Sequence, residues 1–367
     1  MEVPLLDLKA QYATLHDELM GAIEAVMQSQ RFINGPEVGQ LENRIAEYCH
    51  CAGAVGVSSG TDAILCSLMT LGVGTGDEVI TTPYTFFATA GCVRRVGARC
   101  VFVDIEPDTF NIDPGKIEAA VTERTRAIIP VHLFGQMAEM DAIMAIAKKH
   151  DLCVIEDAAQ SIGATYHGHK AGEIGTVGCL SFYPSKNLGG LGDGGMIVAQ
   201  DRQLIEKLAV CRNHGAEPKY YHKFVGGNFR LDTLQAAALL VKLKHLEGWS
   251  AKRRQHAARY NELFANVEDV VTPGIRDYNV TIFNQYVIRT TRRDELRDFL
   301  KENGIGCEIY YPLSLHEQEC FAALGYKRGD FPESEKAAGE TLALPVHPEL
   351  TDEQITHVAG KVKQFLA

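Results

Sequence analysis

One lysine stands in a short loop between two apolar runs, and glycines follow it closely. This residue, Lys186, lies within residues 179–198, where Ser181 and Ser185 place hydroxyl groups near it. The glycines let the backbone approach a bound group where a side chain would not fit. The alternative is an ordinary lysine solvated at the surface. A lysine fixed among glycines and hydroxyls indicates instead an amine that forms a Schiff base with pyridoxal 5′-phosphate.

A second pattern in the same stretch imitates a nucleotide-binding motif. Residues 190–195 read Gly-Leu-Gly-Asp-Gly-Gly, which matches G-x-G-x-x-G literally. In a dinucleotide-binding fold this motif follows a strand and begins a helix. Residues 196–199 read as a strand instead. The sequence therefore argues against a nicotinamide site here.

A carboxylate follows the apolar run at residues 153–156. Asp157 would stand at the carboxyl end of that strand. Pyridoxal phosphate needs an anion at its ring nitrogen, because the protonated ring draws electrons from the carbon that loses its proton. Asp157 suits that role, although it could equally cap a following helix.

Small and aromatic residues follow two other apolar runs. Residues 58–62, Ser-Ser-Gly-Thr-Asp, open a helix whose free N–H groups and dipole favour a phosphate group. A plain helix cap by serine or threonine explains the same residues. Residues 84–87, Tyr-Thr-Phe-Phe, place aromatic rings where one could stack on a planar heterocycle or pack in the core.

These positions are spaced by a regular alternation of strands and helices. Seven apolar runs of strand length stand at residues 54–57, 78–81, 100–104, 127–131, 153–156, 179–183 and 196–199. Near-continuous apolar strands that alternate with helices indicate a mainly parallel sheet covered on both faces. We therefore predict an α/β fold with about seven strands, and ligands bound beyond their carboxyl ends.

Helices and a smaller unit flank this alternation. Apolar residues at helical spacing predict amphipathic helices at residues 12–28, 37–51 and 233–263. A smaller α+β unit follows, with strands at 285–289 and 307–311 and helices at 295–303 and 352–365. We predict a large domain at residues 1–248 with an N-terminal arm, a small domain at residues 249–367, and a hairpin tip at residues 167–169.

The composition is that of an ordinary soluble enzyme. The 36 basic and 47 acidic residues give a net charge of −11, which opposes nonspecific binding to nucleic acids and anionic membranes. The ten cysteines form no C-x-x-C pair, and Cys49-His50-Cys51 lacks further ligands, so we expect reduced thiols and no metal. No apolar run reaches the roughly 18 residues of a membrane span. Because the start also lacks a secretory signal, we expect a cytoplasmic protein.

Six motifs, in this order, resemble those of the DegT/DnrJ/StrS family of pyridoxal phosphate-dependent sugar aminotransferases, which have the fold-type I architecture. The resemblance extends over essentially the whole chain. The motifs are Asp7-Leu-Lys9, Phe32-Ile-x-Gly35-Pro36, Ser59-Gly60-Thr61-Asp62-Ala63, Glu156-Asp157-Ala-Ala-Gln160, Ser181-Phe-Tyr-Pro-Ser-Lys186-Asn-Leu-Gly189 and Asn228-Phe-Arg230-Leu.

This resemblance implies a role for each matching residue. Lys186 resembles the Schiff-base lysine and Asp157 the partner of the ring nitrogen. Gln160 would lie near the phenolic oxygen of the cofactor, and Phe86 would stack on its ring. The phosphate cradle would consist of Gly60, Thr61, Ser181 and, from the other subunit, Asn228. The family completes its active sites across a homodimer, so we expect a monomer to be inactive.

Lys186 also separates two activities within the family. Related dehydratases carry histidine at this position, whereas lysine favours transamination because it serves as both acid and base. The implied reaction takes the amine of L-glutamate and passes it, in ping-pong order, to a nucleotide-linked ketosugar. Segments 212–215, 220–222 and 228–235 look most like those of enzymes that aminate carbon 3 of UDP-2-acetamido-2-deoxy-3-keto-glucose or its glucuronic acid. Such enzymes serve surface polysaccharide or lipopolysaccharide synthesis.

Two other interpretations remain open. One is amination at carbon 4 of a UDP- or dTDP-linked 4-keto-6-deoxy sugar on the same scaffold. The other is a regulator that kept the cofactor fold without turnover, which would need a DNA-binding helix pair for which the chain leaves no room. Five residues are candidates for the nucleotide-sugar site, and each could instead be an ordinary surface or hinge residue: Arg31, His214, Arg230, Tyr311 and His316.

Overall fold

A seven-stranded sheet lies at the centre of the larger part of the chain, in the order β1-β9-β8-β5-β4-β2-β3. Its strands are Gly53–Val57 (β1), Glu78–Thr81 (β2), Arg99–Phe102 (β3), Thr125–Ile128 (β4), Cys153–Asp157 (β5), Val177–Ser181 (β8) and Gly195–Ala199 (β9). In this computed structural model, which describes residues 1–367, β9 runs antiparallel to β1 and β8, and all other neighbours are parallel. The predicted α/β fold is confirmed, and each predicted apolar run overlaps one strand.

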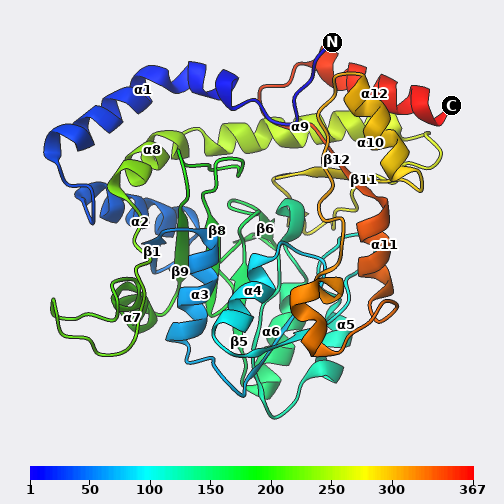
Figure 1. Cartoon of the computed structure of the whole chain (residues 1–367). Helices are drawn as coiled ribbons and strands as arrows, with labels where there is room; N and C mark the ends of the chain where they lie inside the picture. Colours follow the sequence, from blue (N-terminus) through cyan, green and yellow to red (C-terminus); the bar gives the residue numbers. More distant parts are fainter.

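Helices cover both faces of this sheet, because successive residues of a strand point to opposite sides. On β2, Val79 packs into one buried cluster and Ile80 into the other. The Ile80 side is covered by α2 (Pro36–Tyr48), α6 (Met140–His150) and α8 (Thr233–Leu243). The Val79 side is covered by α3 (Gly60–Thr70), α4 (Ala88–Arg95) and α7 (Arg202–Arg212), of which α3 and α4 lie in front of the sheet in Figure 1.

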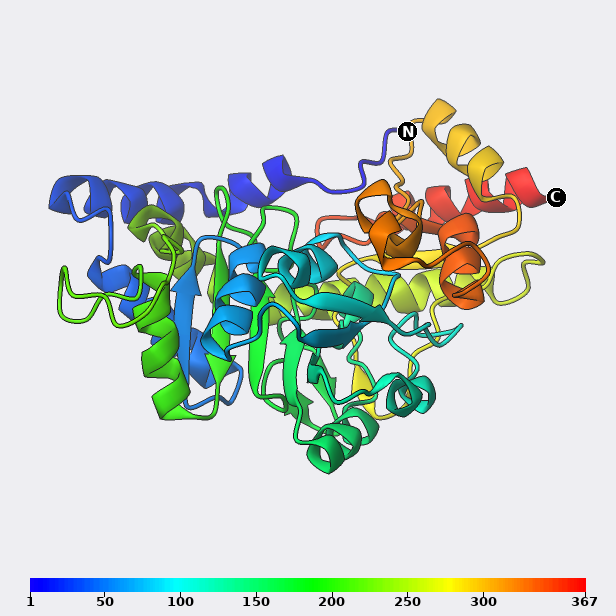
Figure 2. The ribbon, with the colours of Figure 1, turned by 60° about the horizontal axis from the view of Figure 1, so that its bottom comes forward.

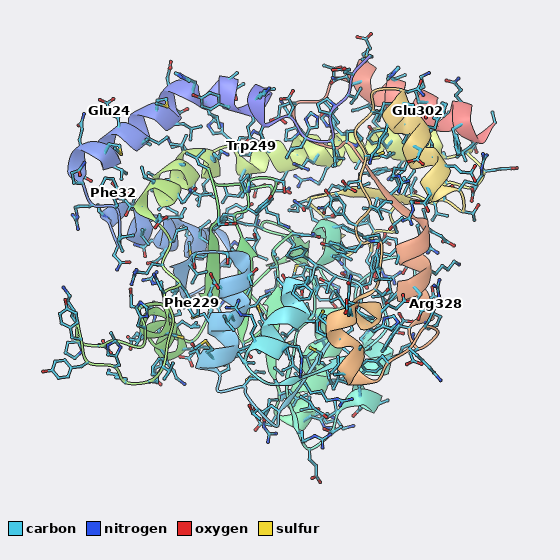
Figure 3. The ribbon with its side chains drawn as sticks, viewed as in Figure 1. Glu24, Phe32, Phe229, Trp249, Glu302 and Arg328 are labelled. Atoms are coloured by element: carbon cyan, nitrogen blue, oxygen red, sulfur yellow. The ribbon has the colours of Figure 1, made fainter.

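The N-terminal helix α1 (Leu8–Ser29) lies along the outside of α8. Its Leu15 and Leu19 pack into a small cluster with α8, and Trp249 of the long helix α9 (Leu246–Phe264) lies beneath it (Figure 3). The predicted single helix over residues 233–263 is wrong, since it breaks between α8 and α9. α8 packs on the sheet and α9 on the smaller core, and helical spacing alone does not detect that change of partner.

A smaller core lies at the end of the molecule where both termini are found (Figure 2). It is built on an antiparallel pair, β11 (Tyr286–Arg289) and β12 (Thr341–Leu344), with α9, α10 (Arg293–Glu302) and α12 (Asp352–Leu366). The predicted strand at residues 307–311 is wrong, because Glu308 makes one isolated bridge to Ala343. The chain then turns away and carries Tyr310 and Tyr311 to the large sheet.

Short elements complete the chain. They are α5 (Pro114–Ile117), α11 (Pro332–Glu340), β6 (Thr165–Tyr166), β7 (His169–Lys170), β10 (Asn279–Val280) and the 3-10 turns η1 (Glu118–Ala120), η2 (Leu133–Gly135), η3 (Leu315–Glu317) and η4 (Glu319–Leu324). β6 and β7 form the predicted hairpin. The predicted division after residue 248 falls within α9 and stays a prediction. None of the helices is both long and apolar enough to span a bilayer.

Candidate active site

A cavity of about 500 Å³ opens at the carboxyl ends of the central strands. Asp157 ends β5, Ser181 ends β8, and Gly60 begins the helix that follows β1, so three separate strands deliver their ends to one place. Tyr310 and Tyr311 approach from the smaller core and close one side. This is the position at which parallel sheets hold ligands.

Lys186 and Asp157 face the same cavity and influence one another. Burial lowers the pKa of the Lys186 ammonium from its ordinary 10.5 to about 8, and the Asp157 carboxylate opposes that effect. The neutral amine is therefore accessible near neutral pH. A lysine in this condition can act as a nucleophile and as a proton acceptor.

The Asp157 carboxylate is buried and held from two sides. Thr89 Oγ1 donates to Asp157 Oδ2 at 2.7 Å, and the backbone N–H of Ala159 donates to Oδ1 at 3.2 Å. Burial raises the pKa of Asp157, while these hydrogen bonds work against it. A buried carboxylate of this kind is stabilised by a cation placed in the cavity, and a protonated ring nitrogen provides one.

The first turn of α3 forms the opposite end of the cavity. Ser59 caps this helix by accepting a hydrogen bond from the backbone N–H of Asp62 at 3.0 Å. A Cβ atom on Gly60 would lie 2.7 Å from Cβ of Ser181, so glycine is required for this close approach of α3 to β8. The first N–H groups of a helix have no partner within it, and Gly60 and Thr61, which open this helix, line the cavity.

Aromatic and amide groups line the wall between these ends. Phe86 is 57% exposed in spite of its apolar ring, and its ring centre lies 6.2 Å from that of Tyr311. Gln160 is fixed at both ends, since its Oε1 accepts from the backbone N–H of Phe134 at 2.8 Å and its Nε2 donates to Tyr311 Oη at 3.2 Å. An exposed flat ring and an oriented amide suit a planar polar ligand.

These groups together fit a phosphorylated pyridine aldehyde. An anion seat at α3 is separated from a buried carboxylate at β5 by a cavity that exposes an aromatic ring and an amine of lowered pKa. When bound, such a group supplies an electron sink that makes a neighbouring C–H bond acidic. Lys186 would hold the aldehyde and move protons, Asp157 would pair with the ring nitrogen, and Gly60, Thr61 and Ser181 would hold the phosphate.

The structure brings eight predicted site residues together at this cavity: Gly60, Thr61, Phe86, Asp157, Gln160, Ser181, Lys186 and Tyr311. Five others lie outside it in the single chain, and four of these have exposed or half-buried side chains. His214 and Asn228 are exposed in the segment after α7, which projects from the body beside Phe229 (Figure 3). Arg31 is exposed beyond α1, and Arg230 is half-buried with no partner for its Nε.

His316 lies away from the cavity, which corrects the expectation that it contacts a substrate. Its side chain is fully buried in η3, where Nε2 contacts Glu335 Oε1 at 3.1 Å. Its ring packs against Phe331 at a centroid distance of 4.8 Å. These contacts join η3 to the start of α11, and a histidine in a polar stretch of sequence gives no sign of such burial.

Sequence reasoning missed several residues of the site. Thr89 holds Asp157, yet 68 residues separate the two in the sequence, so no local pattern connects them. Asp193, Gln285 and Tyr310 also line the cavity. Gln285 comes from the chain entering β11, and a single amide in an apolar strand carries no functional signal.

Comparison with known proteins identifies the family of this chain. The model of the DegT/DnrJ/EryC1/StrS aminotransferase family matches residues 13–363. The chain belongs to this family. This family of aminotransferases depends on pyridoxal phosphate, and its relatives include sugar aminotransferases, so the chain is an aminotransferase that uses this cofactor and acts in the synthesis of nucleotide-linked amino sugars.

Three relatives of this chain carry names that describe different functions. A protein of Geobacillus stearothermophilus called pleiotropic regulatory protein is 56% identical over 100% of this chain and 99% of its own. The UDP-2-acetamido-2-deoxy-3-oxo-D-glucuronate aminotransferase of Pseudomonas aeruginosa is 43% identical over 95% and 96%. The dTDP-3-amino-3,4,6-trideoxy-alpha-D-glucose transaminase of Streptomyces venezuelae is 41% identical over 99% and 96%.

Solved aminotransferases share the fold over the full length. DesV of S. venezuelae superposes with a TM-score of 0.97 at 41% identity, covering 100% of this chain and 98% of that one. NtdA of Bacillus subtilis, solved with its cofactor PMP bound, superposes with a TM-score of 0.91 at 31% identity, covering 100% and 85%. The predicted fold-type I aminotransferase architecture is confirmed.

Proposed function

We propose that this aminotransferase moves the amino group of L-glutamate to carbon 3 of a UDP-linked 2-acetamido-3-ketosugar, of the glucose or glucuronic acid series. The observation that carries the proposal is the placement of Lys186 and Asp157 in one cavity with the anion seat of α3. A lysine of lowered pKa can take a proton from one carbon and return it to another, which transamination requires. The product would enter surface polysaccharide or lipopolysaccharide synthesis.

The names of the relatives agree on carbon 3 as the position of the amine, but they differ in the nucleotide that carries the sugar. The P. aeruginosa and S. venezuelae relatives both carry a 3-oxo or 3-amino designation, one on a UDP sugar and one on a dTDP sugar, at 43% and 41% identity. Amination of a 4-keto-6-deoxy sugar is the alternative on the same scaffold. The position of the amine in the product distinguishes the two.

We propose further that the active protein is a homodimer in the cytoplasm. Large apolar residues are exposed on α1 and on the segment after α7, including Met20 at 45%, Met27 at 48% and Val225 at 87%. We assign these exposed side chains to the dimer interface. In the dimer, the partner subunit's Asn228 would complete the phosphate cradle, and Arg230, His214 and Arg31 would reach the nucleotide sugar.

A substrate panel tests the proposal. The protein, loaded with pyridoxal phosphate, is incubated with L-glutamate and UDP-3-keto, UDP-4-keto, dTDP-3-keto and dTDP-4-keto sugars in turn. Release of 2-oxoglutarate beyond one equivalent per site measures turnover, because the first equivalent needs no ketosugar, and NMR of the product locates the new amine. We expect turnover with the UDP-3-keto sugars and none in Lys186→Ala; preferential turnover with a 4-keto sugar would contradict the carbon assignment.

The relative named as a regulatory protein raises the question of turnover directly. This chain keeps an amine, a paired carboxylate and an anion seat at one cavity, which ligand binding alone does not require. If the loaded protein binds every ketosugar of the panel yet releases no more than one equivalent of 2-oxoglutarate per site, the catalytic proposal fails in favour of a binding role.

A further inference from the structure

The loop that carries Lys186 is closed tightly at its base. The backbone N–H of Phe182 donates to the Gly194 carbonyl at 2.8 Å, and that of Gly190 donates to the Phe182 carbonyl at 2.7 Å. A Cβ atom on Gly189 would lie only 2.2 Å from the Pro184 carbonyl oxygen. The turn around Lys186 therefore depends on where the glycine segment 189–192 is held.

Helix α8 holds this glycine segment through two side chains. Gln235 Oε1 accepts from the backbone N–H of Leu191 at 2.7 Å, and Lys242 Nζ donates to the Gly189 carbonyl at 2.8 Å. Gln235 and Lys242 are seven residues apart, so they lie on the same face of the helix, two turns from one another. The helix thus grips the segment at two points.

Lys242 is an unusual residue for its surroundings. It is 6% exposed in a helix whose other buried residues include Ala236 and Leu239, and its ammonium has no carboxylate partner. Burial lowers the pKa of Lys242. An ammonium carries three donors, and burying it with one carbonyl acceptor is unfavourable. Methionine would fill the same space without that cost. The presence of lysine therefore indicates that its hydrogen bond to Gly189 has a role.

The far side of the loop is held independently. Asn187 Nδ2 donates to the Ile282 carbonyl at 3.1 Å, and Asn284 Nδ2 donates to Asn187 Oδ1 at 2.7 Å. The residue next to Lys186 is therefore anchored to the segment before β11, while α8 fixes the glycine end. Loss of either anchor frees one end of the turn.

We propose that Lys242 is a positioning residue for Lys186: by holding the Gly189 carbonyl, with Gln235 on Leu191, it keeps the Lys186 amine pointed into the cavity toward Asp157. This inference rests on the proposed role of Lys186 as the lysine that binds the cofactor. Small displacements of a reacting group reduce reaction rates steeply. The role is therefore visible in the rate at which Lys186 reacts.

The experiment measures covalent attachment to Lys186 in the full-length protein stripped of cofactor. Pyridoxal 5′-phosphate is added, the reaction is stopped with borohydride at intervals, and the mass of the peptide containing Lys186 is followed. We expect Lys242→Met to attach the cofactor about tenfold more slowly than wild type, and Lys242→Arg, which keeps the donor, to recover most of the rate. The matched control is Lys244→Met at the C-cap of the same helix, where the exposed ammonium contacts Glu18 at 3.1 Å, and its rate should be unchanged.

The outcomes separate the possible failures. If Lys242→Met melts at a lower temperature without cofactor but attaches it at the wild-type rate, Lys242 only stabilises the fold and the inference is overturned. If Lys242→Met does not fold, Gln235→Ala is measured instead; slower attachment supports the inference and an unchanged rate overturns it. If the wild-type protein itself attaches nothing to Lys186, the proposed function fails first.

Discussion

Thr89 donates its hydroxyl hydrogen to the carboxylate of Asp157 across 2.7 Å, at the point where α4 begins beside the end of β5. Thr89 is fully buried, and its hydroxyl oxygen lies 3.2 Å from the hydroxyl oxygen of Thr85. This contact favours the ionised form of a carboxylate whose pKa burial raises. Thr89 therefore maintains the charge that a cationic ring nitrogen requires.

The variant Thr89→Val removes this hydrogen bond with little change in shape. A hydrogen bond to a charged group contributes about 1.5–3 kcal/mol, so we expect cofactor affinity to fall by about ten- to a hundredfold. Thr89→Ser should restore most of it. The measurement is a titration of the stripped protein with pyridoxal phosphate, followed by absorbance; equal affinities of Thr89→Val and wild type would show that the contact is not needed.

The variant Asp157→Asn keeps the shape of the carboxylate and removes its charge. We expect covalent attachment to Lys186 to persist, because the amine is intact, whereas turnover with glutamate falls by at least about a hundredfold, since the ring nitrogen loses its anion. Turnover and borohydride-trapped mass are measured on the same sample. Loss of both together would mean that Asp157 only supports the fold.

The reactivity of Lys186 should depend on pH in a defined direction. Burial lowers the pKa of its ammonium to about 8, and only the neutral amine attacks an aldehyde, so the rate of attachment should rise through about pH 8 and level off above it. The Asp157 carboxylate favours the charged amine, so Asp157→Asn should move the midpoint to lower pH. Rates are normalised to those of a simple free amine, each expressed per neutral molecule of that free amine, which corrects for titration of the aldehyde alone; a shift of the midpoint to higher pH would contradict the contact between Asp157 and Lys186.

The glycine at the start of α3 can be tested by adding one carbon. In Gly60→Ala, the new Cβ would lie 2.7 Å from Cβ of Ser181, so α3 and β8 must separate. We expect a loss of about 1–3 kcal/mol in the free energy of unfolding and weaker cofactor binding. The double variant Gly60→Ala with Ser181→Gly should recover the stability but not the affinity, because the hydroxyl is lost. Thermal melts with and without cofactor separate these two effects.

The fold and half of the site could be predicted because both depend on local signals. Buried parallel strands are continuous apolar runs, and Asp157 and Ser181 stand at their ends, so topology places them together. Thr89 and Lys242 could not be found in this way, because each acts on a segment distant in sequence. His316 was misjudged for a related reason: its burial arises from the packing of η3 on α11, which no periodicity records.

The proposed contribution of Asn228 from the partner subunit makes a prediction about mixed dimers. In one chain Asn228 is exposed outside the cavity that contains Lys186, so its variant Asn228→Ala should weaken cofactor retention only through the partner's site. Lys186→Ala and Asn228→Ala should each be nearly inactive alone. When the two are unfolded together and refolded in equal amounts, half of the dimers are hybrids, and one of the two sites in each hybrid pairs an intact Lys186 with the partner subunit's Asn228. Recovery of up to about a quarter of wild-type activity is therefore expected.

The control mixes Lys186→Ala with Asp157→Asn, and it gives the same result only if those two residues come from different subunits. Because both line one cavity of one chain, that mixture should stay inactive; activity there, or none in the first mixture, would contradict the shared-site arrangement.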